Sequence, residues 1–87
     1  MKIREGFILR TVADTHVVVA VGKESEKFNK MIKLNDSAAF LWRRLNSDRT
    51  IEELACELVS EYGISMDLAT KDVETFISTL KAADLLD

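Results

Sequence analysis

The sequence lacks most of the residues that interrupt or cross-link a chain. It contains no proline, three glycines and one cysteine among 87 residues. A single cysteine excludes an internal disulfide, and there is no Gly-rich or Pro-rich stretch of the kind that forms a linker. We therefore expect one compact domain, residues 1–87, without disulfide bonds, which is typical of a reducing cytoplasm.

Long apolar runs and excess positive charge are also missing. No run approaches the roughly 18 residues of a membrane-spanning helix, and the N-terminal residues do not resemble a signal peptide. The net charge is −3, with Lys and Arg scattered among carboxylates. Phosphate binding usually requires a basic face, so neither a nucleic acid nor a membrane is expected as a partner. The sequence predicts a soluble, cytoplasmic protein.

The first third of the chain has the residue pattern of β-strands. Strands are expected at residues 6–13, 17–22 and 29–34. Asp14 and Thr15 make a connection short enough for a hairpin between the first two strands. In the third, a period of two places Ile32 and Leu34 on one face. The pattern predicts an antiparallel meander, with the third strand at an edge of the sheet.

The rest of the chain has helical periodicity. Helices are expected at residues 36–46, 51–62 and 66–83. Thr50 and Glu53 form a capping box, Gly63 follows the second helix, and Ser65 can cap the third. The predicted fold class is α+β, with an N-terminal three-stranded antiparallel sheet followed by three helices. Phe40 falls nearly opposite the core stripe of its helix, where it either contacts a partner or packs under the hairpin, which is the expected case.

No group of residues has the composition or spacing of a catalytic or metal site. His16 is the single histidine and is expected in a turn, while Cys56 is expected to be a small, partly buried core residue. There is no CxxC pair and no glycine-rich phosphate loop. The sequence therefore predicts a protein that is not an enzyme and has no cofactor or metal.

Two features point to binding instead. A strand at the edge of a sheet has unpaired backbone groups and can accept another strand. Lys30 and Lys33 in the expected third strand either protect this edge against aggregation or attract an acidic peptide. On the third expected helix, at about 100° per residue, one flank carries the residues Leu68, Asp72, Thr75 and Thr79. This flank is either the wall of a shallow groove or an ordinary solvated surface, which is the commoner case.

Three segments together resemble the PqqD-like family. They are Leu34–Trp42, which spans a strand end and a helix start, Thr50–Leu54 with Tyr62, and Asp72–Leu80. The resemblance extends over nearly the whole chain. It departs from the family at Asp84, where a glycine is common. The segment before Leu34 also differs from that of members serving pyrroloquinoline quinone synthesis, which leaves the pathway open.

The resemblance implies a fold similar to a winged helix-turn-helix and a stand-alone peptide chaperone. Such domains bind the leader segment of a ribosomally made precursor peptide and present it to a modifying enzyme, often a radical SAM protein. The leader adds as a strand to the third strand and lies in a cleft against the third helix. Carried over by position, the peptide-binding residues are Asn29, Lys30, Met31, Ile32, Lys33, Leu34, Leu68, Asp72, Thr75, Phe76 and Thr79.

Two alternatives remain open. A winged-helix DNA-binding protein has a similar fold, but its recognition helix is normally basic. The third expected helix has Lys71 and Lys81 against several carboxylates, which makes a poor phosphate-binding surface. The second alternative is a structural module that forms a homodimer through its edge strands or through the valine-rich face of the sheet.

Overall fold

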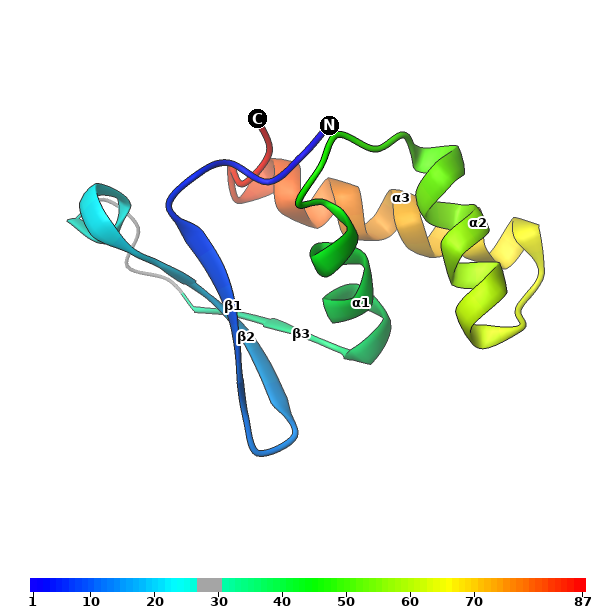
Figure 1. Ribbon diagram of the computed structural model, residues 1–87, viewed down its shortest axis with the longest axis horizontal. Helices are drawn as coiled ribbons and strands as arrows, with labels where there is room; N and C mark the ends of the chain where they lie inside the picture. Colours follow the sequence, from blue (N-terminus) through cyan, green and yellow to red (C-terminus); the bar gives the residue numbers. More distant parts are fainter. Residues whose placement is uncertain (27–30) are drawn as a thin grey trace.

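The computed structural model describes residues 1–26 and 31–87 as a three-stranded antiparallel sheet followed by three helices (Figure 1). The elements are β1 (Phe7–Val12), β2 (Thr15–Ala20), a 3₁₀ helix η1 (Gly22–Glu26), β3 (Ile32–Leu34), α1 (Asp36–Arg44), α2 (Ile51–Tyr62) and α3 (Met66–Ala82). The α+β class and the order of the elements predicted from the sequence are confirmed.

The hairpin of β1 and β2 is tighter than the sequence pattern indicates. Val12 lies opposite Thr15, so Ala13 and Asp14 alone form the turn. The residue pattern instead placed the turn at Asp14 and Thr15 and began the second strand at residue 17. Ala13 has a positive φ of 55°, which suits a two-residue hairpin turn but is uncommon for alanine. The sequence therefore gave no signal for it.

β3 lies at an edge of the sheet, whose strand order is β1-β2-β3. It pairs antiparallel with β2, with Leu34 opposite His16 and Ile32 opposite Val18. The expected third strand began at residue 29, whereas the described strand begins at Ile32. Met31 precedes it, and Asn29 and Lys30 lie outside the described residues.

One face of the sheet forms part of the hydrophobic core. Phe7, Val18 and Leu34 point to this face and belong to the same buried cluster as residues from all three helices. Val18 is fully buried at the centre of the middle strand. Figure 1 shows the three helices gathered on one side of the sheet. The position of β3 beside the helices is therefore fixed by burial of its Leu34 side chain.

Both ends of α2 and the start of α3 have the capping residues that the sequence predicts. The hydroxyl of Thr50 accepts from the Glu53 amide at 3.1 Å, and the Glu53 carboxylate accepts from the Thr50 amide at 3.0 Å. Gly63, with a φ of 65°, ends α2 in the left-handed conformation. Ser65 accepts from the Leu68 amide at the start of α3. Local side-chain hydrogen bonds thus define where α2 and α3 lie along the chain.

The chain reverses after α3 at Asp84, which has a positive φ of 58°. The PqqD-like resemblance implies a glycine at this position, and aspartate tolerates the left-handed conformation better than most residues do. The turn brings Leu85 into the core, where it is fully buried, and pairs Leu86 with Ile3. The departure from glycine therefore leaves the terminal leucines packed against the domain.

Two expectations about single side chains are wrong. Cys56 is exposed rather than partly buried. Phe40 packs against α2 rather than under the hairpin. Its ring meets the ring of Tyr62 edge-on with centroids 5.8 Å apart, and the Arg44 guanidinium lies over it at 4.3 Å. In both cases helical periodicity predicts the side of the helix on which the residue lies. It does not predict whether another element packs against that side.

None of the helices in the described ranges, 1–26 and 31–87, is both long and apolar enough to cross a membrane.

Candidate functional site

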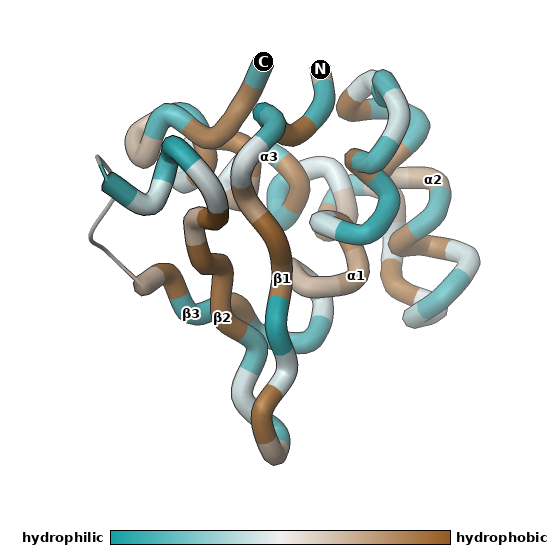
Figure 2. The backbone as a smooth tube through the Cα atoms, turned by 60° about the vertical axis from the view of Figure 1, so that its left-hand side comes forward, coloured by the Kyte–Doolittle hydropathy of each residue, from teal (hydrophilic) through white to brown (hydrophobic). Residues whose placement is uncertain are grey.

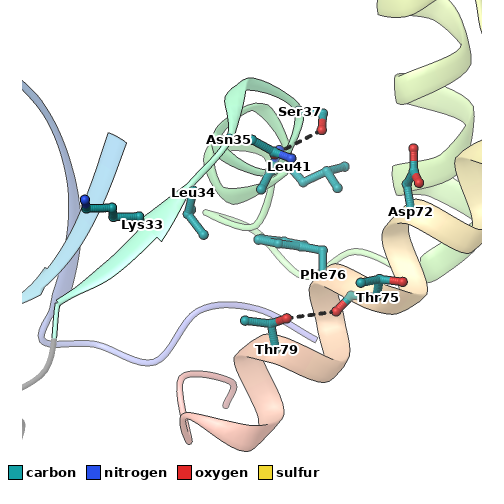
Figure 3. Close-up of a pocket in the computed structure, with 10 residues that line it drawn as sticks. Lys33, Leu34, Asn35, Ser37, Leu41, Asp72, Thr75, Phe76 and Thr79 are labelled. Atoms are coloured by element: carbon teal, nitrogen blue, oxygen red, sulfur yellow. Dashed lines mark hydrogen bonds between the residues drawn. The ribbon is translucent and has the colours of Figure 1, made fainter. Parts of the chain in front are cut away.

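A cleft of about 300 Å³ lies between the end of β3, the first turns of α1 and the middle of α3 (Figure 3). The residues that line it are Lys33, Leu34, Asn35, Ser37, Ala38, Leu41, Asp72, Thr75, Phe76 and Thr79. The strand and the two helices are brought together because each contributes apolar side chains to the same core cluster. In the cleft, the polar residues of these three elements leave part of that core uncovered.

The floor of the cleft is apolar. Leu34, Leu41 and Phe76 are each at most 8% exposed, so they are core residues whose outer surface also forms the floor. Figure 3 shows Leu34 of β3 and Phe76 of α3 pointing toward one another. A ligand that lies in the cleft therefore gains apolar contact without the protein having to open its core.

The rim of the cleft is polar and locally ordered. The Asn35 side-chain oxygen accepts from the Ala38 amide at 2.9 Å and from the Ser37 hydroxyl at 3.2 Å. On the opposite side, the Thr79 hydroxyl donates to the carbonyl of Thr75 at 3.1 Å. These bonds hold three rim side chains against their own helices. The rim is therefore preorganised, and its polar groups do not fill the cleft.

Asp72 is the acidic group of this rim. It is exposed, and within residues 1–26 and 31–87 its carboxylate makes no hydrogen bond or ion pair. Lys33 is the basic group among the lining residues, but its side chain extends away from the cleft (Figure 3). The lining contains no histidine or cysteine. This composition suits non-covalent binding of an apolar group more than acid–base or nucleophilic chemistry.

The structure brings six of the sequence-predicted site residues to this cleft: Lys33, Leu34, Asp72, Thr75, Phe76 and Thr79. Three others do not line it. Leu68 is exposed one turn nearer the start of α3, Met31 is exposed before β3, and Ile32 packs against the core. Asn29 and Lys30 lie outside the described residues.

Sequence reasoning missed the contribution of α1. No binding role is predicted for this helix from the sequence, yet Asn35, Ser37 and Ala38 form one wall of the cleft and Leu41 contributes to its floor. A signal was present, because Ser37, Ala38 and Leu41 share one side of the helix at spacings of three and four. Small side chains on the first turn leave space beside the strand end that leads into the helix.

Two solved structures share the fold. One is the protein TbiB1 in complex with the TbiA(β) leader peptide, with a TM-score of 0.78 and 20% identity over 100% of this chain and 95% of that one. The other is a lasso peptide synthetase B1 complexed with its leader peptide, with a TM-score of 0.74 and 23% identity over 97% and 93%. At these identities the likeness establishes the fold alone.

Comparison with curated proteins gives no match. The family comparison is more informative, because residues 15–86 match the family described as coenzyme PQQ synthesis protein D (PqqD). The matched region begins at β2 and includes β3, the cleft and all three helices. The chain therefore belongs to the PqqD family.

Proposed function

We propose that this protein is a non-catalytic chaperone that binds the leader segment of a ribosomally made precursor peptide. The leader adds as a strand to the free edge of β3, and alternate side chains enter the cleft against α3. The observation that carries the proposal is that this edge runs beside a cleft with an apolar floor. Membership of the PqqD family and the two structural neighbours named as leader-peptide complexes support it.

The two parts of the site, the edge of β3 and the cleft, contribute differently to binding. Backbone groups of an edge strand bind any extended segment, and so they contribute affinity with little selectivity. The cleft accepts side chains from one face of that segment, because successive side chains of a strand point to opposite faces. Leu34, Phe76 and Leu41 offer apolar contact, and Thr75 and Thr79 line the cleft with short side chains. A leader with apolar residues at alternate positions fits this arrangement.

The recipient of the leader is, in this proposal, a separate modifying enzyme. The PqqD-like resemblance favours a radical SAM protein. A modifying enzyme of another class is the alternative recipient. Co-purification with each candidate enzyme, in the presence and absence of precursor peptide, distinguishes the two. The true recipient is expected to be retained with the chaperone. It is also expected to modify the precursor peptide faster when the chaperone is present.

The direct test is an NMR titration of the labelled protein with precursor peptides encoded near its gene. Amide shifts are expected at Ile32–Leu34 and at Asp72–Thr79, with smaller changes at α2. A scrambled leader of the same composition is the control. A duplex DNA titration addresses the DNA-binding alternative. Saturable, salt-sensitive binding to DNA together with no response to any precursor peptide would overturn the proposal.

A further inference from the structure

The outer face of the sheet, opposite the helices, has an unusual arrangement of charge and apolar surface. Its residues alternate with those that point to the core, and they are Ile8, Arg10, Val12, Thr15, Val17, Val19 and Lys33. None of these seven belongs to or packs against the core cluster of the described residues. We call this set the outer face. Figure 2 shows the strands that carry it.

A single row crosses the outer face on all three strands. Arg10 of β1 lies opposite Val17 of β2, and Val17 lies opposite Lys33 of β3. Val17 is only 7% exposed although the helices lie on the other side of the sheet. Val17 lies between Arg10 and Lys33 in register, and long basic side chains bury neighbouring apolar surface under their aliphatic stems. The row ends at Lys33, on the free edge.

Within residues 1–26 and 31–87, the charges of this row have no counterpart. Neither Arg10 nor Lys33 makes an ion pair or side-chain hydrogen bond within the described residues. The four residues outside the description, at positions 27–30, include no acidic residue. The protein as a whole has a net charge of −3. Two uncompensated cations are therefore aligned toward the edge where another strand is added.

We propose that the leader strand added to β3 carries an acidic side chain beside Lys33 on the outer face, while its neighbouring apolar side chains enter the cleft. This inference rests on the proposed function and specifies its substrate class. Residues directly opposite each other on paired strands interact, and opposite charges there are favourable while like charges are unfavourable. An acidic residue beside Lys33 extends the row from Arg10 through Val17 by one strand. The bound segment thus has the pattern apolar, acidic, apolar.

The same geometry argues against a second copy of this chain as the occupant. An antiparallel pairing of two β3 edges centred on this row brings Lys33 close to Lys33 of the other copy. Like charges at that position oppose the association. The row therefore favours a partner with the opposite charge, and an extended acidic-apolar peptide fits the single free strand edge.

The test is a selection of random peptides displayed on phage, carried out in parallel on the wild-type protein, Lys33→Glu and Lys23→Glu. Lys23 is an exposed residue of η1, so its variant has the same change in net charge away from the row. The wild-type protein and Lys23→Glu are expected to enrich peptides with Asp or Glu between two apolar positions. Lys33→Glu is expected to enrich Lys or Arg at that position, with the apolar positions unchanged.

A selected peptide and its Glu→Lys form then give a double-mutant cycle by fluorescence anisotropy. Each mismatched combination is expected to bind about two- to fivefold more weakly than the matched one, the range of a cross-strand charge pair. If wild type and Lys33→Glu enrich the same residue between the apolar positions, the inference is wrong and the proposed function stands. If the wild-type protein enriches no extended peptide at all, the proposed function fails and the inference with it.

Discussion

The Nε2 atom of His16 lies 2.9 Å from a carboxylate oxygen of Asp36, and this contact ties β2 to the first turn of α1. The other ring nitrogen of His16 lies 2.8 Å from the Thr11 hydroxyl of β1. His16 is also the register partner of Leu34, which lies two residues before Asp36. The single histidine, expected in a turn, thus lies within β2 and holds the strand-to-helix junction that forms one wall of the cleft.

Removing this tie is expected to destabilise the protein slightly. Asp36→Ala loses both a favourable charge at a helix start and the bond to His16. Asp67→Ala, in the first turn of α3, loses only the former. The difference between the two in the free energy of unfolding, measured by urea titration, is expected to be about 0.5–1 kcal/mol. Equal losses for the two variants would show that the histidine contact contributes nothing measurable.

Blocking the cleft entrance is expected to abolish leader binding without unfolding the protein. Thr75 lines the cleft on the exposed side of α3, and Ser78 is exposed on the same helix but does not line it. Thr75→Arg is expected to weaken binding of a precursor peptide more than tenfold, because the new side chain occupies the space of the peptide. Ser78→Arg adds the same charge and is expected to bind normally. Isothermal calorimetry measures both, and similar affinities for the two variants would move the site elsewhere.

The capping box of α2 is expected to contribute measurably to stability. Thr50→Ala removes the hydroxyl that accepts from the Glu53 amide, and the loss of such a cap costs about 1 kcal/mol. Ser60→Ala, on the exposed face inside the same helix, is expected to be neutral or slightly stabilising because alanine has the higher helix propensity. Thermal and urea unfolding both report the difference, and a Thr50 variant as stable as the Ser60 variant would exclude the cap as a determinant.

The capping box of α2 also makes the stability of the protein depend on pH. The Thr50 backbone N–H, which donates to the Glu53 carboxylate, lowers the pKa of Glu53 from its ordinary value of 4.5. A lowered pKa in the folded state contributes stability above the unfolded-state pKa, and that stability is lost as the pH falls through the folded-state value. Glu53→Gln is therefore expected to flatten the decline of stability below about pH 4.5. Urea titrations at several pH values test this, and parallel curves for variant and wild type would contradict it.

The reversal at Asp84 is expected to tolerate glycine better than alanine. Asp84 combines a left-handed backbone with an ion pair to Arg4 at 2.9 Å. Asp84→Ala loses the ion pair and retains a Cβ at positive φ, with an expected loss of about 1 kcal/mol. Asp84→Gly also loses the ion pair but relieves the backbone, so its free energy of unfolding is expected to lie above that of the alanine variant. The opposite order would show that the side chain matters more than the backbone.

Much of the architecture was predictable from local patterns. Period-two and helical spacings identified the strands and helices. The caps at Thr50, Gly63 and Ser65 identified both ends of α2 and the start of α3. The position of the hairpin turn was predicted wrongly because the turn depends on a positive φ at Ala13, and alanine does not indicate a positive φ. Cys56 and Phe40 were misjudged because periodicity gives a direction but not the element found there.

The α3 side of the cleft was likewise visible in the sequence, since Asp72, Thr75 and Thr79 share a helix flank by spacing alone. Whether that flank faces solvent or a groove depends on which element lies opposite, and spacing does not contain this information. The α1 wall, with Ser37 and Ala38, was missed for the same reason.

The sequence by itself determined the elements, their order and their apolar faces, because these follow from periodicity and capping between residues close in the chain. Only the tertiary structure decided the site. It placed the end of β3 against α3, put Leu34 and Phe76 on one floor, and aligned Arg10, Val17 and Lys33 in one row. These relationships join residues distant in the chain, and they are set by the burial of a shared core and by strand register, neither of which any single segment encodes.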